Sequence, residues 1–119
     1  MHVRHLKDCT EFLAGDNSLL RELLNPTKDT IQTRYSLAWA QVKPGEKTLV
    51  HKLEASEVYY IIKGSGIIHT NNEERKVNKN DTIYIPPNSI QFIENNGEEN
   101  LEFLCIVDPA WTPDAEKIL

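Results

Sequence analysis

Long hydrophobic runs are missing from this 119-residue sequence, and so is any concentration of positive charge. No apolar stretch approaches the roughly 18 residues that a membrane-spanning helix needs, and the N-terminal MHVRHLKDCT lacks the apolar core of a signal peptide. Lysine and arginine total 13 against 18 aspartates and glutamates, which gives a net charge of −5 without a basic stripe. We therefore expect a soluble, cytoplasmic protein that has neither nucleic acid nor a membrane as its partner.

Cysteine is scarce as well, since the chain has only Cys9 and Cys105. They lie too far apart for a C-x-x-C pair, and two cysteines cannot form a zinc knuckle. Cys105 lies within the apolar run LEFLCIV, which favours a small buried hydrophobic side chain over a reactive pocket thiol. No phosphate-binding loop, dinucleotide fingerprint or nucleophile–base pair is recognisable, so the sequence leaves the substrate and the reaction open.

What the chain does contain is a series of short β-type segments, and its length fits one domain. We expect an N-terminal segment over 1–30, a strand-rich region over 31–108 and a tail over 109–119 with one helical turn at 114–119. Many short strands between turn signals predict an all-β sandwich or barrel. The predicted strands cover 19–24, 31–42, 48–53, 57–63, 67–70, 75–77, 82–85, 90–95 and 101–107.

The stretch GEKTLVHKLEASEVYYIIKG, residues 45–64, has the clearest pattern in the chain. Strand side chains alternate between faces, so His51 and Leu53 share one face, and Glu57, Tyr59 and Ile61 share a face of the following strand. We expect a tight connection that sets His51 and Glu57 together across a strand pair.

This spacing resembles the first motif of the cupin superfamily, G-x5-H-x-H-x3-E-x6-G. Gly45, His51, Glu57 and Gly64 stand at four of its positions, and Leu53 stands at the position of the second histidine. The chain is thus similar to a small single-domain cupin of the cupin 2 type, with a degenerate set of metal ligands.

A second stretch, NDTIYIPPNSIQFIEN at residues 80–95, resembles the second cupin motif, G-x5-P-x-G-x2-H-x3-N. Pro86 and Asn95 match, and Gln91 replaces the histidine. Asn80 and Asn88 replace two glycines, and asparagine is the residue other than glycine that best tolerates left-handed backbone. The two motifs together imply a double-stranded β-helix, the jelly-roll barrel of that family.

The resemblance also implies partners and ligands. Cupins commonly form homodimers, so we expect a homodimer in which the N-terminal segment leans on the barrel or on the partner subunit. In cupins the motif histidines and glutamate bind a transition metal, which implies His51, Glu57 and Gln91 as ligands here. Leu53 removes one imidazole and Gln91 offers only an amide oxygen, so we expect a weakly held Mn, Fe, Zn or Ni ion, or no metal.

The expected functional centre is a pocket inside the barrel, bordered by the three ligand candidates together with Tyr59, Asn95 and Trp39, with Leu53 and Ile61 as apolar walls. A few polar groups in an apolar concavity are typical of a small-molecule site. Two functions fit this pattern. One is a divalent-metal-dependent isomerase, decarboxylase or dioxygenase. The alternative is a metal-free module that binds a sugar-like or carboxylate molecule without catalysis.

Overall fold

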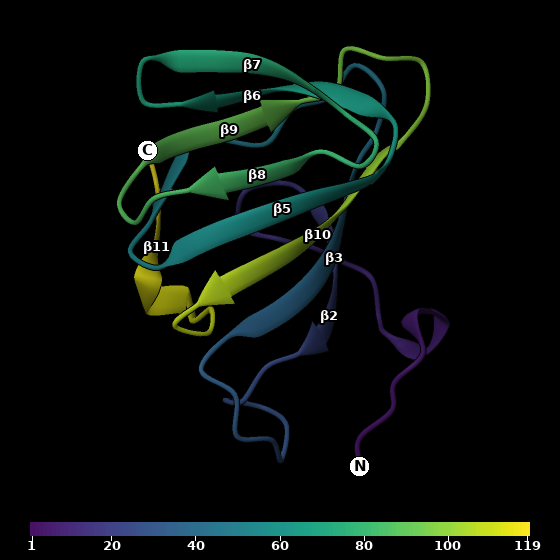
Figure 1. The fold of residues 1–119 in the computed structure, drawn as a ribbon, viewed down its shortest axis with the longest axis vertical. Helices are drawn as coiled ribbons and strands as arrows, with labels where there is room; N and C mark the ends of the chain where they lie inside the picture. Colours follow the sequence, from purple (N-terminus) through teal and green to yellow (C-terminus); the bar gives the residue numbers. More distant parts are fainter.

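The computed structural model describes residues 1–119 and consists of two antiparallel β-sheets without an α-helix. In spatial order, the larger sheet contains β1 (Phe12–Leu13), β2 (Leu19–Leu24), β3 (Ser36–Val42), β10 (Leu101–Asp108), β5 (Ser56–Lys63) and β8 (Thr82–Ile85). The smaller sheet contains β11 (Glu116–Ile118), β4 (His51–Leu53), β9 (Ile90–Glu94), β6 (Ser65–Thr70) and β7 (Glu73–Asn78). Short 3-10 helices, η1 (Leu6–Asp8) and η2 (Pro113–Ala115), lie near the termini. The predicted all-β jelly roll is confirmed (Figure 1).

Most of the predicted strands are present with bounds within a few residues, and β2 and β8 match their predicted ranges. Two regions differ. The strand expected over 48–53 is regular only as β4. The residues before β4 are not part of a named strand, and they have only an isolated bridge between Lys47 and Glu94 and single hydrogen bonds such as the one from the Thr48 amide to Ile93. The tail has one turn of 3-10 helix and then adds β11 to the smaller sheet, beside β4.

Left-handed backbone occurs where the motif comparison expects it. Asn80 and Asn88, which stand at two glycine positions of the second motif, have φ angles of 74° and 65°. Gly64 has a φ of 83°, and a Cβ atom there would lie 2.5 Å from the carbonyl oxygen of Asn100. The turns that close the barrel therefore depend on residues that tolerate this conformation.

The connection between β4 and β5 carries the chain from one sheet to the other, so our expectation of a paired hairpin here is wrong. β4 pairs with β9 and β11 in the smaller sheet, whereas β5 pairs with β8 and β10 in the larger one. The bend at Glu54 and Ala55 turns inward and buries Ala55. His51 and Glu57 consequently face each other across the interior of the barrel instead of lying side by side on neighbouring strands.

The N-terminal segment leans on its own barrel in this chain. β2 pairs with β3 at the edge of the larger sheet, and the two residues of β1 pair with β2. The turn between β1 and β2, residues 14–18, is fixed by bonds from the Ala14 amide to Ser18 and from the Leu49 amide to Asp16. This turn closes one end of the space between the sheets.

The main core lies between the two sheets. Buried and more exposed side chains alternate along the strands, because successive side chains of a strand point to opposite faces. In β10, for example, Leu101, Phe103, Cys105 and Val107 are buried while the residues between them are not. Side chains of the smaller sheet, such as Ile93, complete the same cluster from the other side. No helix in the structure has the length and hydropathy needed to span a membrane.

Candidate functional site

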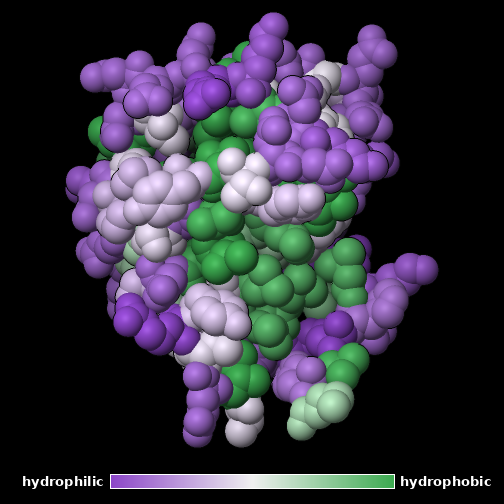
Figure 2. Space-filling view, in the orientation of Figure 1, coloured by the Kyte–Doolittle hydropathy of each residue, from purple (hydrophilic) through white to green (hydrophobic).

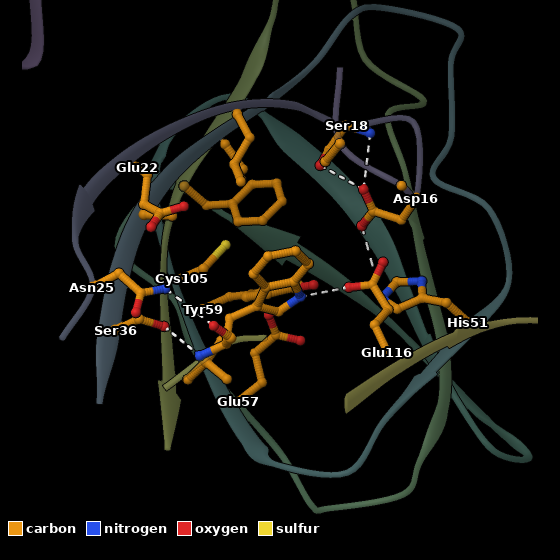
Figure 3. A pocket seen from close by; sticks show the side chains of 18 of the residues that line it. Asp16, Ser18, Glu22, Asn25, Ser36, His51, Glu57, Tyr59, Cys105 and Glu116 are labelled. Carbon is orange, nitrogen blue, oxygen red and sulfur yellow. Dashed lines mark hydrogen bonds and ion pairs between the residues drawn. The ribbon is translucent and has the colours of Figure 1, made fainter. Parts of the chain in front are cut away.

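A cavity of about 80 Å³ lies inside the barrel, between the larger sheet and the strands β4 and β11. Figure 3 shows that Asp16, His51 and Glu116 gather at one side of it, whereas Glu22, Asn25, Ser36 and Cys105 lie at the other. The lining combines aromatic and aliphatic side chains with these polar groups, which is the usual composition of a small-molecule site. His51, Glu57 and Tyr59, three of the predicted site residues, line this cavity.

Small side chains on β3 leave the room for the cavity. Ser36, Ala38 and Ala40 face it, because alternate residues of a strand share one side of the sheet. Trp39, predicted as a pocket wall, points to the opposite face of β3 and does not line the cavity. It is 7% exposed there, with the guanidinium carbon of Arg21 at 5.6 Å from its ring.

Glu57 places a carboxyl group at the cavity with one oxygen unsatisfied. The residue lies on the buried face of β5 and is 7% exposed, and its Oε1 has no hydrogen-bond partner. Burial, followed by the charges of Asp16 and Glu116, raises the pKa of Glu57 from its ordinary 4.5 to about 8, although hydrogen bonds with Gln91 and Tyr59 oppose the shift. The carboxyl group is therefore mostly protonated at neutral pH and can donate a hydrogen bond.

His51 and Gln91 are direct register partners on β4 and β9, a pairing that was not predicted from the sequence. The Nδ1 atom of His51 lies 2.7 Å from the carbonyl oxygen of Leu49. Because a carbonyl oxygen only accepts, Nδ1 bears a proton, and Nε2 is the nitrogen left to face Asp16 Oδ2 at 3.8 Å. Gln91 is 1% exposed, and its Oε1 receives the Tyr59 hydroxyl at 3.4 Å.

Two carboxylates of the site, Asp16 and Glu116, were missed from the sequence. Asp16 lies in the β1–β2 turn, where its Oδ1 accepts from the amide and the hydroxyl of Ser18 at 3.0 Å and 2.7 Å. Glu116 begins β11 and accepts from the indole nitrogen of Trp111 at 2.9 Å. The turn-forming character of residues 15–18 was visible in the sequence, but no local signal indicates that either carboxylate reaches the barrel interior.

Asn95 was predicted to border the pocket, and the structure gives it a different position. It is 2% exposed and does not line the cavity. Its amide nitrogen donates to the carbonyl oxygens of Val42 at 2.9 Å and Glu99 at 2.8 Å, while its oxygen accepts from the Gly97 amide. Asn95 therefore holds the loop between β9 and β10, because all three partners are backbone groups.

The expected metal ligands do not fit a tightly bound transition metal. No group of three or more His, Cys, Asp or Glu side chains is arranged to hold a metal ion. Leu53, at the position of the second motif histidine, is 2% exposed, packs with Ala55 and Val107, and does not itself line the cavity. Gln91 adds only a neutral amide oxygen, so His51 would be the sole nitrogen donor, where multi-histidine sets are usual.

Tyr59 and Cys105 complete the buried floor as uncharged groups. The Tyr59 ring packs on Phe103 with 4.5 Å between ring centres. Burial, reinforced by the nearby charge of Glu57, raises the pKa of both Tyr59 and Cys105 well above the ordinary values. The thiol, free of any disulfide, therefore stays protonated at neutral pH and is a poor nucleophile.

Comparison with known proteins agrees with the two motifs. The family model of the cupin domain matches residues 38–107. An uncharacterised protein of Methanocaldococcus jannaschii is 42% identical over 109 residues, which cover 91% of this chain and 86% of that protein. An oxalate-binding protein of Thermotoga maritima is 32% identical over 68 residues, which cover 56% of each chain.

Solved structures show the same fold at low sequence identity. A predicted oxalate decarboxylase of Thermotoga maritima has a TM-score of 0.80 at 22% identity, with 91% of this chain and 99% of that chain covered. An ectoine synthase from P. lautus has a TM-score of 0.80 at 21% identity, with 100% and 90% covered. These likenesses show the jelly-roll architecture and leave the activity to the site itself.

Proposed function

The chain belongs to the cupin family, and from that premise we propose that it binds a small molecule in the cavity between its sheets, without a metal ion. The observation that supports this function best is the buried Oε1 of Glu57, which has no partner and belongs to a side chain lining the cavity. A buried polar atom without a hydrogen bond costs about 1–3 kcal/mol. A ligand that bonds to this oxygen would recover that cost.

The other groups around the cavity suit recognition more than catalysis. Gln91 and Tyr59 are uncharged donors and acceptors that hold the carboxyl group of Glu57 in place. Cys105, the cysteine that lines the cavity, is kept as a thiol by burial. Polar groups of this kind fix the orientation of a ligand, and the apolar walls supply most of its contact area.

The charge around the cavity also restricts the ligand. Four carboxyl side chains line it, and neither lysine nor arginine does. The similarity to an oxalate-binding protein and to a predicted oxalate decarboxylase would suggest a dicarboxylate, but such an anion would meet the charges of Asp16 and Glu116, which no lysine or arginine of the lining balances. We therefore favour an uncharged or cationic ligand for this chain.

The alternative function is a divalent-metal-dependent isomerase, decarboxylase or dioxygenase. One observation favours it: His51 and Glu57 both line the cavity and Gln91 pairs in register with His51, so the family's ligand positions lie near one another even though their side chains differ. If a metal ion were bound, it would supply Lewis acidity, and His51 Nε2 and Glu57 would be its strongest ligands.

A paired experiment separates the two functions. Protein purified without chelator is analysed for manganese, iron, nickel and zinc, and a metabolite library is screened by thermal shift against wild type, Glu57→Leu and Glu54→Leu. Glu54 is exposed and lies three residues away, so it controls for the loss of a carboxylate. We expect substoichiometric metal, and ligands that stabilise wild type and the control but not Glu57→Leu. One metal ion per chain, with ligand binding lost on chelation, would establish the alternative. Ligand shifts retained in Glu57→Leu would place the binding site elsewhere.

The proposed function includes a homodimer formed through the outer face of the larger sheet. Tyr60, Ile62, Tyr84 and Ile106 are 36–64% exposed on that face. The register joins them into one patch, because Val58 lies opposite both Tyr84 and Ile106. The apolar area in the middle of Figure 2 lies over this part of the molecule. A contiguous apolar patch of this kind marks an interaction surface, and a twofold pair is the commonest way to cover one.

A further inference from the structure

Acidic side chains predominate among the ionisable residues that line the cavity. Of the side chains that line it, Asp16, Glu22, Glu57 and Glu116 are acidic, and His51 is the only basic one. The charge of Glu22 is balanced by Lys28, which does not line the cavity, because Glu22 Oε2 lies 3.0 Å from the ammonium group of Lys28. The other three carboxyl groups have no lysine or arginine within ion-pair distance.

These three carboxyl groups converge although they come from three different parts of the chain. Asp16 belongs to the β1–β2 turn, Glu57 to β5 and Glu116 to β11, and all three line the cavity; Figure 3 shows Asp16 and Glu116 at one side of it, with Glu57 lower in the view. The charges of Asp16 and Glu116 both act on Glu57, which places them within electrostatic range of it. Glu57 is 7% exposed with Oε1 unpartnered, so the cluster includes a buried acceptor that the protein itself leaves unused.

Extending the proposed function, on which this inference rests, we propose that the ligand is a small organic cation. Its ammonium or guanidinium group would lie among Asp16, Glu57 and Glu116 and donate to the free oxygen of Glu57. Hydrogen bonds from a cationic donor to the carboxylates of Asp16 and Glu116 are about twice as strong as neutral ones, and the protonated carboxyl group of Glu57 still offers its unpartnered Oε1 as an acceptor. Burying like charges without a cation is unfavourable, and a cationic ligand removes that cost.

The remainder of the cavity suits a short apolar body attached to the cationic group. Away from the three carboxyl groups the walls are Ala38, Ala40 and Phe103, with the indole of Trp111 beside Glu116. The volume of about 80 Å³ is roughly half that of a ~150 Å³ cavity that holds benzene, which favours a ligand of a few carbon atoms.

The test uses three probes that share one carbon frame and differ in charge: n-propylammonium, 1-propanol and propionate. Each is titrated at pH 7 into metal-free protein, and binding is measured by amide chemical-shift changes at cavity residues. We expect propylammonium to bind about tenfold or more tighter than 1-propanol, since charge-assisted bonds exceed neutral ones by that margin or more. Propionate should not bind.

A variant that removes charge without changing shape gives the second measurement. Asp16→Asn keeps the oxygen that accepts from Ser18, and Glu116→Gln keeps an acceptor for the indole of Trp111. The double variant should lose about tenfold or more of its propylammonium affinity while its 1-propanol affinity stays within about twofold. Glu54→Gln, an exposed carboxyl outside the cavity, should leave both affinities unchanged.

The outcomes distinguish this inference from the proposed function. If 1-propanol or propionate binds at the cavity as tightly as propylammonium, the site is correct and the cationic specificity is overturned. If the double variant binds propylammonium as wild type does, the three carboxyl groups do not receive the cation and the inference also fails. If none of the probes binds and the metabolite screen finds no ligand that depends on Glu57, both proposals fail.

Discussion

Replacing Glu57 with glutamine should make the protein more stable at alkaline pH and leave it nearly unchanged at pH 4.5. The pKa of Glu57 is raised from 4.5 to about 8 by burial and by the charges of Asp16 and Glu116. Between these two values the folded protein keeps a proton that the unfolded chain has released, so the free energy of unfolding falls as the pH rises through this window. Below pH 4.5 both states are protonated, and the group adds no pH dependence.

The size of the effect follows from the width of the window. Each pH unit costs about 1.4 kcal/mol, so the wild type should lose on the order of 3–5 kcal/mol relative to Glu57→Gln between pH 4.5 and 8. Glutamine has nearly the same shape and no charge, so the difference between the two proteins isolates the ionisation of this one group. Urea unfolding followed by tryptophan fluorescence, at fixed protein concentration and several pH values, measures it.

The control for this experiment is Glu54→Gln, which removes an exposed carboxyl group three residues away. The difference in the free energy of unfolding between Glu54→Gln and wild type should be small and independent of pH. If the difference in the free energy of unfolding between wild type and Glu57→Gln were also independent of pH, the carboxyl group of Glu57 would be hydrated in the folded protein. The argument for a buried, unsatisfied acceptor would then be wrong.

Three further predictions concern other parts of the molecule. Asn88→Ala should lower the free energy of unfolding by about 1 kcal/mol and Asn88→Gly should not, because φ is 65° there; thermal unfolding of the two variants checks this. In native protein a thiol reagent should modify the partly exposed Cys9 quickly and Cys105 only after unfolding, and equal rates would contradict the burial of Cys105. Light scattering at micromolar concentration should give a dimer for wild type and a monomer for Ile106→Lys. The control Ile90→Lys, which changes an exposed isoleucine of the smaller sheet, should remain dimeric. A monomeric wild type would contradict the dimer proposal.

Much of the fold was predictable because short-range patterns determine it. Strand alternation predicts the buried face of β5 and of β10, and the asparagines at glycine positions mark two left-handed turns that the structure contains. These features depend on residues close together in the chain, or on two motifs whose relative position the family fold defines.

The predictions that were wrong depend on which sheet a strand joins and on which face of the strand turns toward the interior. β3 has a large-residue face with Trp39 and a small-residue face with Ala38 and Ala40, and alternation alone does not say which borders the interior. The small face does, because the space beside it is the cavity. Asp16 lies 29 residues before Gly45 and Glu116 lies 21 residues after Asn95, outside both motifs, so only the three-dimensional path of the turn and of β11 brings them to the cavity that Glu57 lines.

The central claim is that the barrel cavity is a small-molecule site that works without a metal ion, and diffraction from crystals soaked in Mn²⁺ tests it most directly. An anomalous difference map should show no peak within bonding distance of His51 Nε2, because one imidazole, one buried protonated carboxyl and one amide form a poor ligand set. Ordinary electron density in the cavity against Glu57 Oε1, from solvent or a ligand, would agree with the account. An anomalous peak coordinated by His51, Glu57 and Gln91 would contradict it.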